Sequence, residues 1–146
     1  MSRFTNILVV SPLPDGKTWT IKSDFGYDVG SENSGNTINV PIGFQTDFAS
    51  VPRMLWWLLP KWGIYGNAAV IHDYCYWIQH PYTRKQADEI LKEAMIVLQT
   101  PAWQIFLIYW AVYLFGKGAW KKNSRLKKQG INRIAVQTKA TEQRAW

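Results

Sequence analysis

The chain has 146 residues, of which 47% are apolar and 15% are aromatic, and it contains nine tryptophans. A chain of this length can bury roughly two thirds of its unfolded surface without metals or disulfides. The composition excludes a disordered chain, which lacks the apolar surface needed to offset the entropy cost of folding. We therefore expect one globular domain.

The net charge of +7 is concentrated near the C-terminus. Residues 1–116 hold eight Lys or Arg and nine Asp or Glu, whereas residues 117–146 hold nine Lys or Arg and one acid, Glu142. Such a segment attracts phosphates with little regard to sequence. We expect a globular domain over residues 1–118 and a basic C-terminal arm over residues 119–146 that binds polyanions weakly. This arm is either extended or a short helix followed by a disordered end. The alternative is a solvated end that keeps the protein soluble.

The first part of the sequence predicts short strands. "NILVVSPL" (6–13) and "KTWTIKS" (17–23) are rich in β-branched residues and flank the turn-forming "PDG". "YDV" (27–29) and "TINV" (37–40) flank a loop rich in Ser, Asn and Gly. Two hairpins therefore predict a small antiparallel sheet by about residue 45.

Helix signals begin after this sheet. Ser50 is a suitable N-cap for a short helix that Pro60 ends. A second helix can start at Asn67 and must end before Pro81, because a proline disfavours helical geometry in the residue before it. A capping box of Thr83 and Gln86 opens the third, whose apolar residues recur with helical spacing over 87–98.

Residues 94–116 contain no charged side chain, so a membrane span has to be considered. Pro101 restarts the pattern, however, and Gln104 lies within a remaining run that is shorter than the roughly 20 residues a span needs. We expect a buried core helix over residues 101–116. Together these elements predict an α+β fold in which an N-terminal small antiparallel sheet packs against a C-terminal layer of three to four helices.

A histidine and an aspartate lie side by side in the apolar and aromatic stretch "AAVIHDYCYW". An imidazole beside a carboxylate can supply a general base together with a metal ligand or an orienting group. Asp47 in "TDFASVPR" and Asp88 in "QADEILKEAM" are two further acids, and we expect both to share one pocket with His72 and Asp73. Alternatively, His72 is a hydrogen-bonded structural residue, and Asp47 or Asp88 caps a helix or pairs with Arg53.

The cysteine content places limits on location and on one resemblance. Cys75 is the single cysteine, and the N-terminus lacks the layout of a secretory signal, so we expect folding in a reducing cytoplasm. "HDYCY" resembles the His-Asp-x-Cys-Tyr signature of secreted phospholipases, but the calcium loop of that family is absent and its disulfide framework needs more than one cysteine.

A longer resemblance covers about residues 36–118. "VPIGFQTDFASVPRMLWWLLPKWGIYGNAAVIHDYCY", "TRKQADEILKEAM" and "YWAVYLFGKGAW" resemble, in order, the phage and prophage proteins of domain-of-unknown-function family 1353. The resemblance implies a phage-encoded protein found among tail, lysis or accessory genes, without an established reaction. It also implies that Asp47, His72, Asp73 and Asp88 lie on positions that the family pattern holds.

Two hypotheses about function follow. In the first, the protein is a small hydrolase of a host-derived polymer such as cell-wall peptide: His72 is the general base, Asp73 and Asp88 orient it or join it in binding a divalent cation, and Asp47 completes the site. In the second, it is a non-catalytic virion, tail or host-interaction protein whose polar groups form a buried network. Both place it in the host bacterial cytoplasm, with incorporation into the virion left open. Catalysis requires solvent access to His72, whereas a structural network requires every polar atom to be paired inside the protein.

Overall fold

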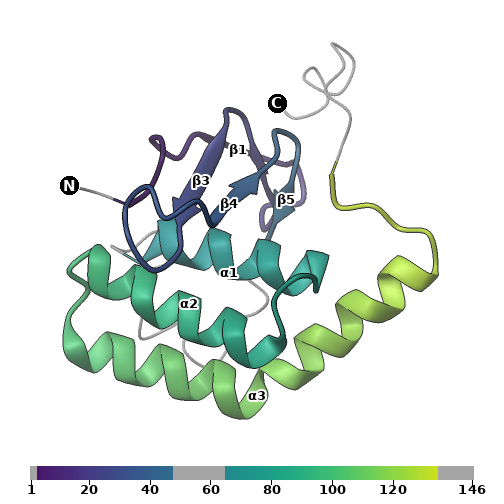
Figure 1. Ribbon diagram of the computed structural model, residues 1–146. Helices are drawn as coiled ribbons and strands as arrows, with labels where there is room; N and C mark the ends of the chain where they lie inside the picture. The colour runs from purple at the N-terminus through teal and green to yellow at the C-terminus, as the bar shows by residue number, and fades with distance from the viewer. Residues whose placement is uncertain (1–2, 48–64, 135–146) are drawn as a thin grey trace. The chain divides into compact units, whose positions relative to one another are not determined.

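The computed structural model describes residues 3–47 and 65–134 of the chain (Figure 1). Short strands in the N-terminal half are followed by three helices, which is an α+β layout. The described residues divide into a sheet unit, residues 3–47 with 131–134, and a helical unit, residues 65–130. The short helix predicted between Ser50 and Pro60 lies outside the described residues.

The sheet unit contains both predicted hairpins. β1 (Val10–Pro12) pairs antiparallel with β2 (Trp19–Ile21), which also pairs with β5 (Gln45–Thr46). β3 (Phe25–Asp28) pairs with β4 (Thr37–Val40) in a separate two-stranded sheet. The hairpin predictions are confirmed, and the strands form two small sheets where one was predicted.

Carboxylates fix the geometry of both hairpin connections. Asp15 accepts a hydrogen bond from the backbone N–H of Thr18 at 2.8 Å and from its hydroxyl at 2.5 Å, beside Gly16 in the left-handed region. Asp28 accepts from the hydroxyl of Thr37 at 2.6 Å, across the second hairpin. These hydroxyl bonds stabilise the charged carboxylates and are the main reason that the pKa values of Asp15 and Asp28 are lowered.

Aromatic side chains form much of the sheet unit's interior. The ring of Phe4 lies 5.7 Å from that of Phe25 and 4.9 Å from that of Tyr27, measured between ring centroids. Such ring pairs add to the free energy gained from burial alone. Further buried apolar residues of the unit are Ile21, Ile38, Val40 and Phe44.

The helical unit consists of α1 (Gly66–Ile78), α2 (Arg84–Val97) and α3 (Ala102–Lys128), and α2 contacts both of the other helices (Figure 1). The predicted capping box is present: the Thr83 hydroxyl accepts from the Gln86 N–H, and the Gln86 side chain accepts from the Thr83 N–H. The apolar stripe of α2 is buried, as its spacing predicts, through Ala87, Ile90, Leu91, Ala94 and Met95.

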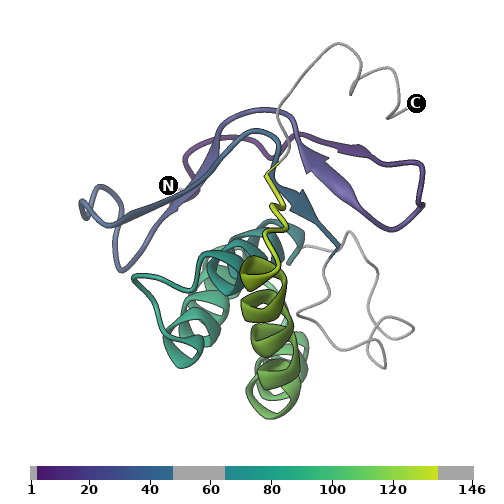
Figure 2. The same cartoon turned by 90° about the vertical axis from the view of Figure 1, so that its right-hand side faces the viewer.

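α3 is longer than predicted, because the helix continues ten residues beyond position 118 to Lys128. Contacts with the C-terminal end of α1 hold this extension: Asn123 donates to the Tyr76 carbonyl at 3.2 Å and Lys127 to the Ile78 carbonyl at 2.9 Å. Figure 2 shows this half of α3 facing the viewer. The predicted boundary at residue 118 therefore falls inside a helix.

The helix predicted over residues 101–116 exists, but the prediction that it is buried is wrong for one of its sides. Ile108, Ala111 and Val112 are buried, whereas Trp103 and Phe106 are exposed. No helix in the described ranges, 3–47 and 65–134, is long and apolar enough to cross a membrane. α3 is thus a surface helix with one buried face.

Candidate functional site

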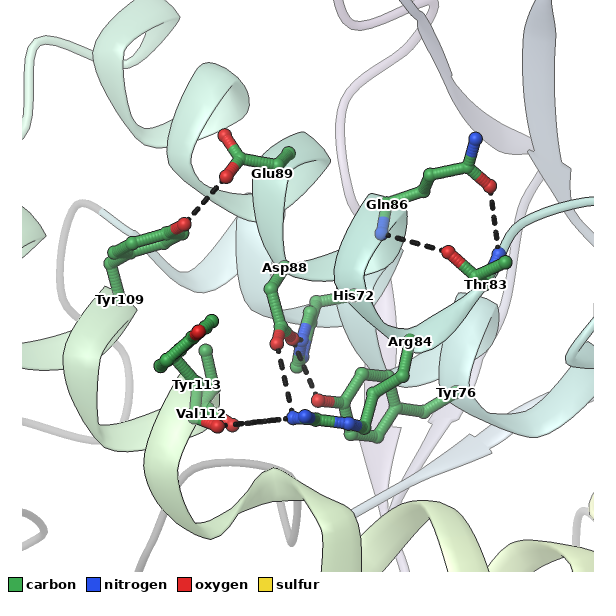
Figure 3. Close-up of polar contacts among 10 residues, drawn as sticks. All are labelled: His72, Tyr76, Thr83, Arg84, Gln86, Asp88, Glu89, Tyr109, Val112 and Tyr113. Carbon is green, nitrogen blue, oxygen red and sulfur yellow. Dashed lines mark hydrogen bonds and ion pairs between the residues drawn. The ribbon is translucent and has the colours of Figure 1, made fainter.

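A histidine and a carboxylate meet in the interior of the helical unit. His72 lies in α1 and Asp88 in α2, with His72 Nε2 2.8 Å from Asp88 Oδ1 (Figure 3). The side chain of His72 is 0% exposed and that of Asp88 is 1% exposed. A carboxylate oxygen accepts, so the tautomer with its proton on Nε2 is the one that donates in this pair.

Tyr76 adds a second donor to the same carboxylate. It follows His72 by four residues, so both side chains lie on one face of α1. Its hydroxyl donates to Asp88 Oδ1 at 2.6 Å, and its ring centroid lies 4.2 Å from that of His72. Burial raises the pKa of Tyr76, and the hydrogen bond to Asp88 and the charge of Asp88 raise it further. The phenol is therefore kept protonated as a donor.

Arg84 extends the network to the third helix. It precedes Asp88 by four residues on α2, and its Nη1 lies 3.4 Å from Asp88 Oδ2. The same nitrogen donates to the carbonyls of Val112 at 3.3 Å and Tyr113 at 3.2 Å on α3. The Arg84 side chain is 28% exposed, so it forms the outer end of the network. One connected set of polar contacts thus joins all three helices (Figure 3).

A glycine allows α3 to approach the buried phenol. A Cβ built on Gly116 would contact the Tyr76 hydroxyl directly and would lie 3.3 Å from Cζ of the ring. The Trp120 ring, one turn further along α3, meets the Tyr76 ring edge-on at 5.2 Å between centroids. Glycine is therefore required at position 116 by the close packing of α3 on α1.

The structure brings together two of the four residues predicted to form a site, His72 and Asp88. Asp73 is also buried on α1, but consecutive helical residues project about 100° apart, so it leaves the helix on a different side from His72. Asp47 belongs to the sheet unit, where its Oδ1 lies 3.8 Å from Nη2 of Arg133. A shared pocket of all four residues stays a prediction.

The donor set around Asp88 does not fit a divalent cation. Across the described ranges, no three or more His, Cys, Asp or Glu side chains are grouped so that they could hold a metal ion. The outer oxygen of Asp88 already faces the positive guanidinium of Arg84. The predicted metal role of His72, Asp73 and Asp88 finds no support in this geometry.

Sequence reasoning missed Tyr76, Arg84 and Gly116. The first two could have been found from helical spacing, because Tyr76 is four residues after His72 and Arg84 is four residues before Asp88. Gly116 carries no such signal, since its role depends on how two helices pack.

The arrangement is internally complete. No buried side-chain nitrogen or oxygen of His72, Tyr76 or Asp88 is left without a hydrogen-bond partner. Burying an imidazole and a carboxylate costs free energy unless both are paired, and here each is. The geometry therefore has the properties of a structural tie: it is desolvated, fully bonded and shared by three helices.

The family model described as "Protein of unknown function (DUF1353)" matches residues 19–112, which contain His72, Tyr76, Arg84 and Asp88. An "Uncharacterized protein y4jT" of Sinorhizobium fredii (strain NBRC 101917 / NGR234) is 32% identical over 98 residues, and the match covers 66% of this chain and 28% of that protein. The chain thus spans less than a third of this relative. No solved structure shows a significant match to the chain. Because the family model covers more than half of the sequence, the chain belongs to the DUF1353 family of proteins of unknown function.

Proposed function

We propose that this protein is a non-catalytic phage protein that acts through interactions with virion, tail or host components. The observation that carries the proposal is the complete burial of His72, at 0% exposure, with its polar atoms paired. A general base must reach a substrate directly or through one water. An imidazole enclosed in this way serves to position helices.

A binding protein also has a reason to keep a buried imidazole and carboxylate, although burying them costs free energy. Asp88 accepts hydrogen bonds from both His72 and Tyr76, and both bonds can form only when α1 and α2 are in one relative position. A fixed helical unit presents a fixed outer surface to a partner. The resemblance to phage and prophage proteins supports the phage assignment, with the host bacterial cytoplasm as the place of folding and the virion as a destination.

A small hydrolase acting on a host polymer such as cell-wall peptide is the second candidate. The 2.8 Å contact between His72 and Asp88 favours it, because a carboxylate at hydrogen-bond distance orients an imidazole for proton transfer. This function requires an opening motion that brings solvent to His72.

One pair of measurements separates the candidates. Wild type and His72→Asn are incubated with purified peptidoglycan, released fragments are identified by mass spectrometry against a lysozyme control, and thermal unfolding is recorded for both proteins. A structural tie predicts no fragments from either protein and a clearly lower melting temperature for the variant. Fragments released by the wild type and absent with an equally stable variant would establish the hydrolase instead.

A further inference from the structure

One side of α3 carries large apolar side chains exposed to solvent. Trp103 is 54%, Phe106 63% and Leu114 62% exposed, and Trp110 and Tyr113 are exposed as well. The spacings of three, four and seven residues among them place all five on one helical face. We call these five residues the aromatic stripe.

The rings of this stripe contact each other at the surface. The ring centroids of Trp110 and Tyr113 are 5.3 Å apart with the rings edge-on, and those of Phe106 and Trp110 are 6.3 Å apart. Phe106, Trp110 and Tyr113 thus form a continuous patch, whereas an isolated exposed apolar side chain would need no explanation. A continuous exposed apolar patch of this kind is typical of a surface that binds a membrane or another molecule.

Cations continue the same face along the second half of α3. Lys117 follows Trp110 by seven residues, Lys121 follows Leu114 by seven, and Lys128 follows Lys121 by seven, so each lies two turns further along the same side. All three lysines are exposed. We call them the lysine row. Over its whole length α3 contains six Lys or Arg and no Asp or Glu.

We propose that this face of α3 binds the surface of an anionic lipid bilayer. The aromatic stripe enters the boundary between headgroups and acyl chains, and the lysine row pairs with lipid phosphates. Exposed Trp and Phe beside Lys and Arg, without acids, is the composition of helices that lie in a membrane interface. This role goes beyond the proposed interaction function and does not depend on it.

Charge favours a bilayer over a second copy of the chain as the occupant. Two α3 faces brought together in parallel would place one lysine row against the other, with no acid on either helix to neutralise them. An anionic bilayer complements both features, because its acyl chains can take up the aromatic stripe and its phosphates can pair with the lysine row.

The test is binding of the full-length protein to vesicles, measured by co-sedimentation. Vesicles of phosphatidylcholine mixed with phosphatidylglycerol should bind the protein in a salt-dependent manner, and vesicles of phosphatidylcholine alone should bind it far more weakly. Replacing the lysine row with glutamine should weaken binding to the anionic vesicles about 100-fold. The matched control, Lys17→Gln with Lys85→Gln and Lys122→Gln, removes the same charge from exposed positions outside this face of α3 and should keep most of the binding.

A second variant tests the aromatic stripe separately. Phe106→Ser with Leu114→Ser leaves the charge unchanged and alters only exposed side chains, so the melting temperature should be preserved while binding to anionic vesicles falls at least tenfold. Failure of the wild type to bind anionic vesicles overturns the proposal. It is equally overturned if the serine variant binds like the wild type, which would indicate simple charge adsorption. A dimer seen by light scattering that the serine variant dissociates would assign the stripe to self-association.

Discussion

Removing the carboxylate of Asp88 should destabilise the helical unit. Asp88→Ala takes the acceptor away from His72 Nε2 and from the Tyr76 hydroxyl at once. It also takes the carboxylate away from Arg84, which keeps its backbone contacts on α3. The perturbation thus strikes the carboxylate that joins α1 to α2 and that also faces the guanidinium bound to α3.

The magnitude follows from the burial of the groups left behind. Each buried donor left without an acceptor costs about 1–3 kcal/mol, and the loss of Asp88 leaves two of them, His72 Nε2 and the Tyr76 hydroxyl. The contribution of Arg84 is small, because its guanidinium is part-exposed and screened by solvent. We expect the free energy of unfolding to fall by about 2–6 kcal/mol, which for a chain of this length lowers Tm by about 6–20 °C.

Urea and thermal unfolding, followed by circular dichroism, measure this loss. Glu89→Ala is the matched control, because it removes the same charge from the next residue of α2, where the exposed carboxylate only accepts from Tyr109. That variant should lose less than about 1 kcal/mol. If the two alanine variants have the same stability, the inference that the buried network holds the helices together is wrong.

Three further predictions concern other positions. Gly116→Ala should lower Tm because its Cβ would meet the phenol packed against it, whereas Gly118→Ala, with nothing within 4 Å, should gain about 1 kcal/mol; thermal melts compare the two. Burial raises the pKa of Cys75 to about 12, so Ellman's reagent at about pH 8 should label this thiol only after denaturation. The lowered pKa of Asp28 contributes stability above its ordinary value of 3.8, and this contribution is lost as pH falls through the folded value. NMR titration should show that Thr37→Val moves the midpoint of Asp28 upward, and an unchanged midpoint would contradict the assigned cause.

Elements encoded by neighbouring residues were predictable from the sequence. The start of α2 follows from Thr83 and Gln86 because both partners of the capping box lie within one turn. The continuation of α3 to Lys128 was not predicted, because the like charges beyond residue 118 favoured a separate arm, either extended or a short helix. Lys and Arg are good helix formers, and the contacts of Asn123 and Lys127 with the end of α1 are tertiary, so no local pattern reveals them.

The candidate site was predictable only in part, for a related reason. The sequence singles out His72 and Asp88, and the structure joins them. The sequence does not determine which of two adjacent residues, His72 or Asp73, faces α2, because that depends on the rotation of α1 about its axis. The burial of the pair depends equally on packing, and burial is what favours a structural role over a catalytic one.

The contact between Gly116 and Tyr76 fixes α3 both along and around its own axis. If α3 slid by about one turn, Val112 or Trp120 would replace Gly116 against the phenol. Either side chain would clash there, because even a Cβ added to Gly116 is too close to the Tyr76 hydroxyl. Only one setting of the helix is therefore compatible with the interior, and that setting determines which side chains point to solvent. The buried contact between Gly116 and Tyr76 therefore determines which residues of α3 form its outer surface. A substitution at the buried phenol should consequently alter how the far side of the helix is displayed, although no atom of that side is touched.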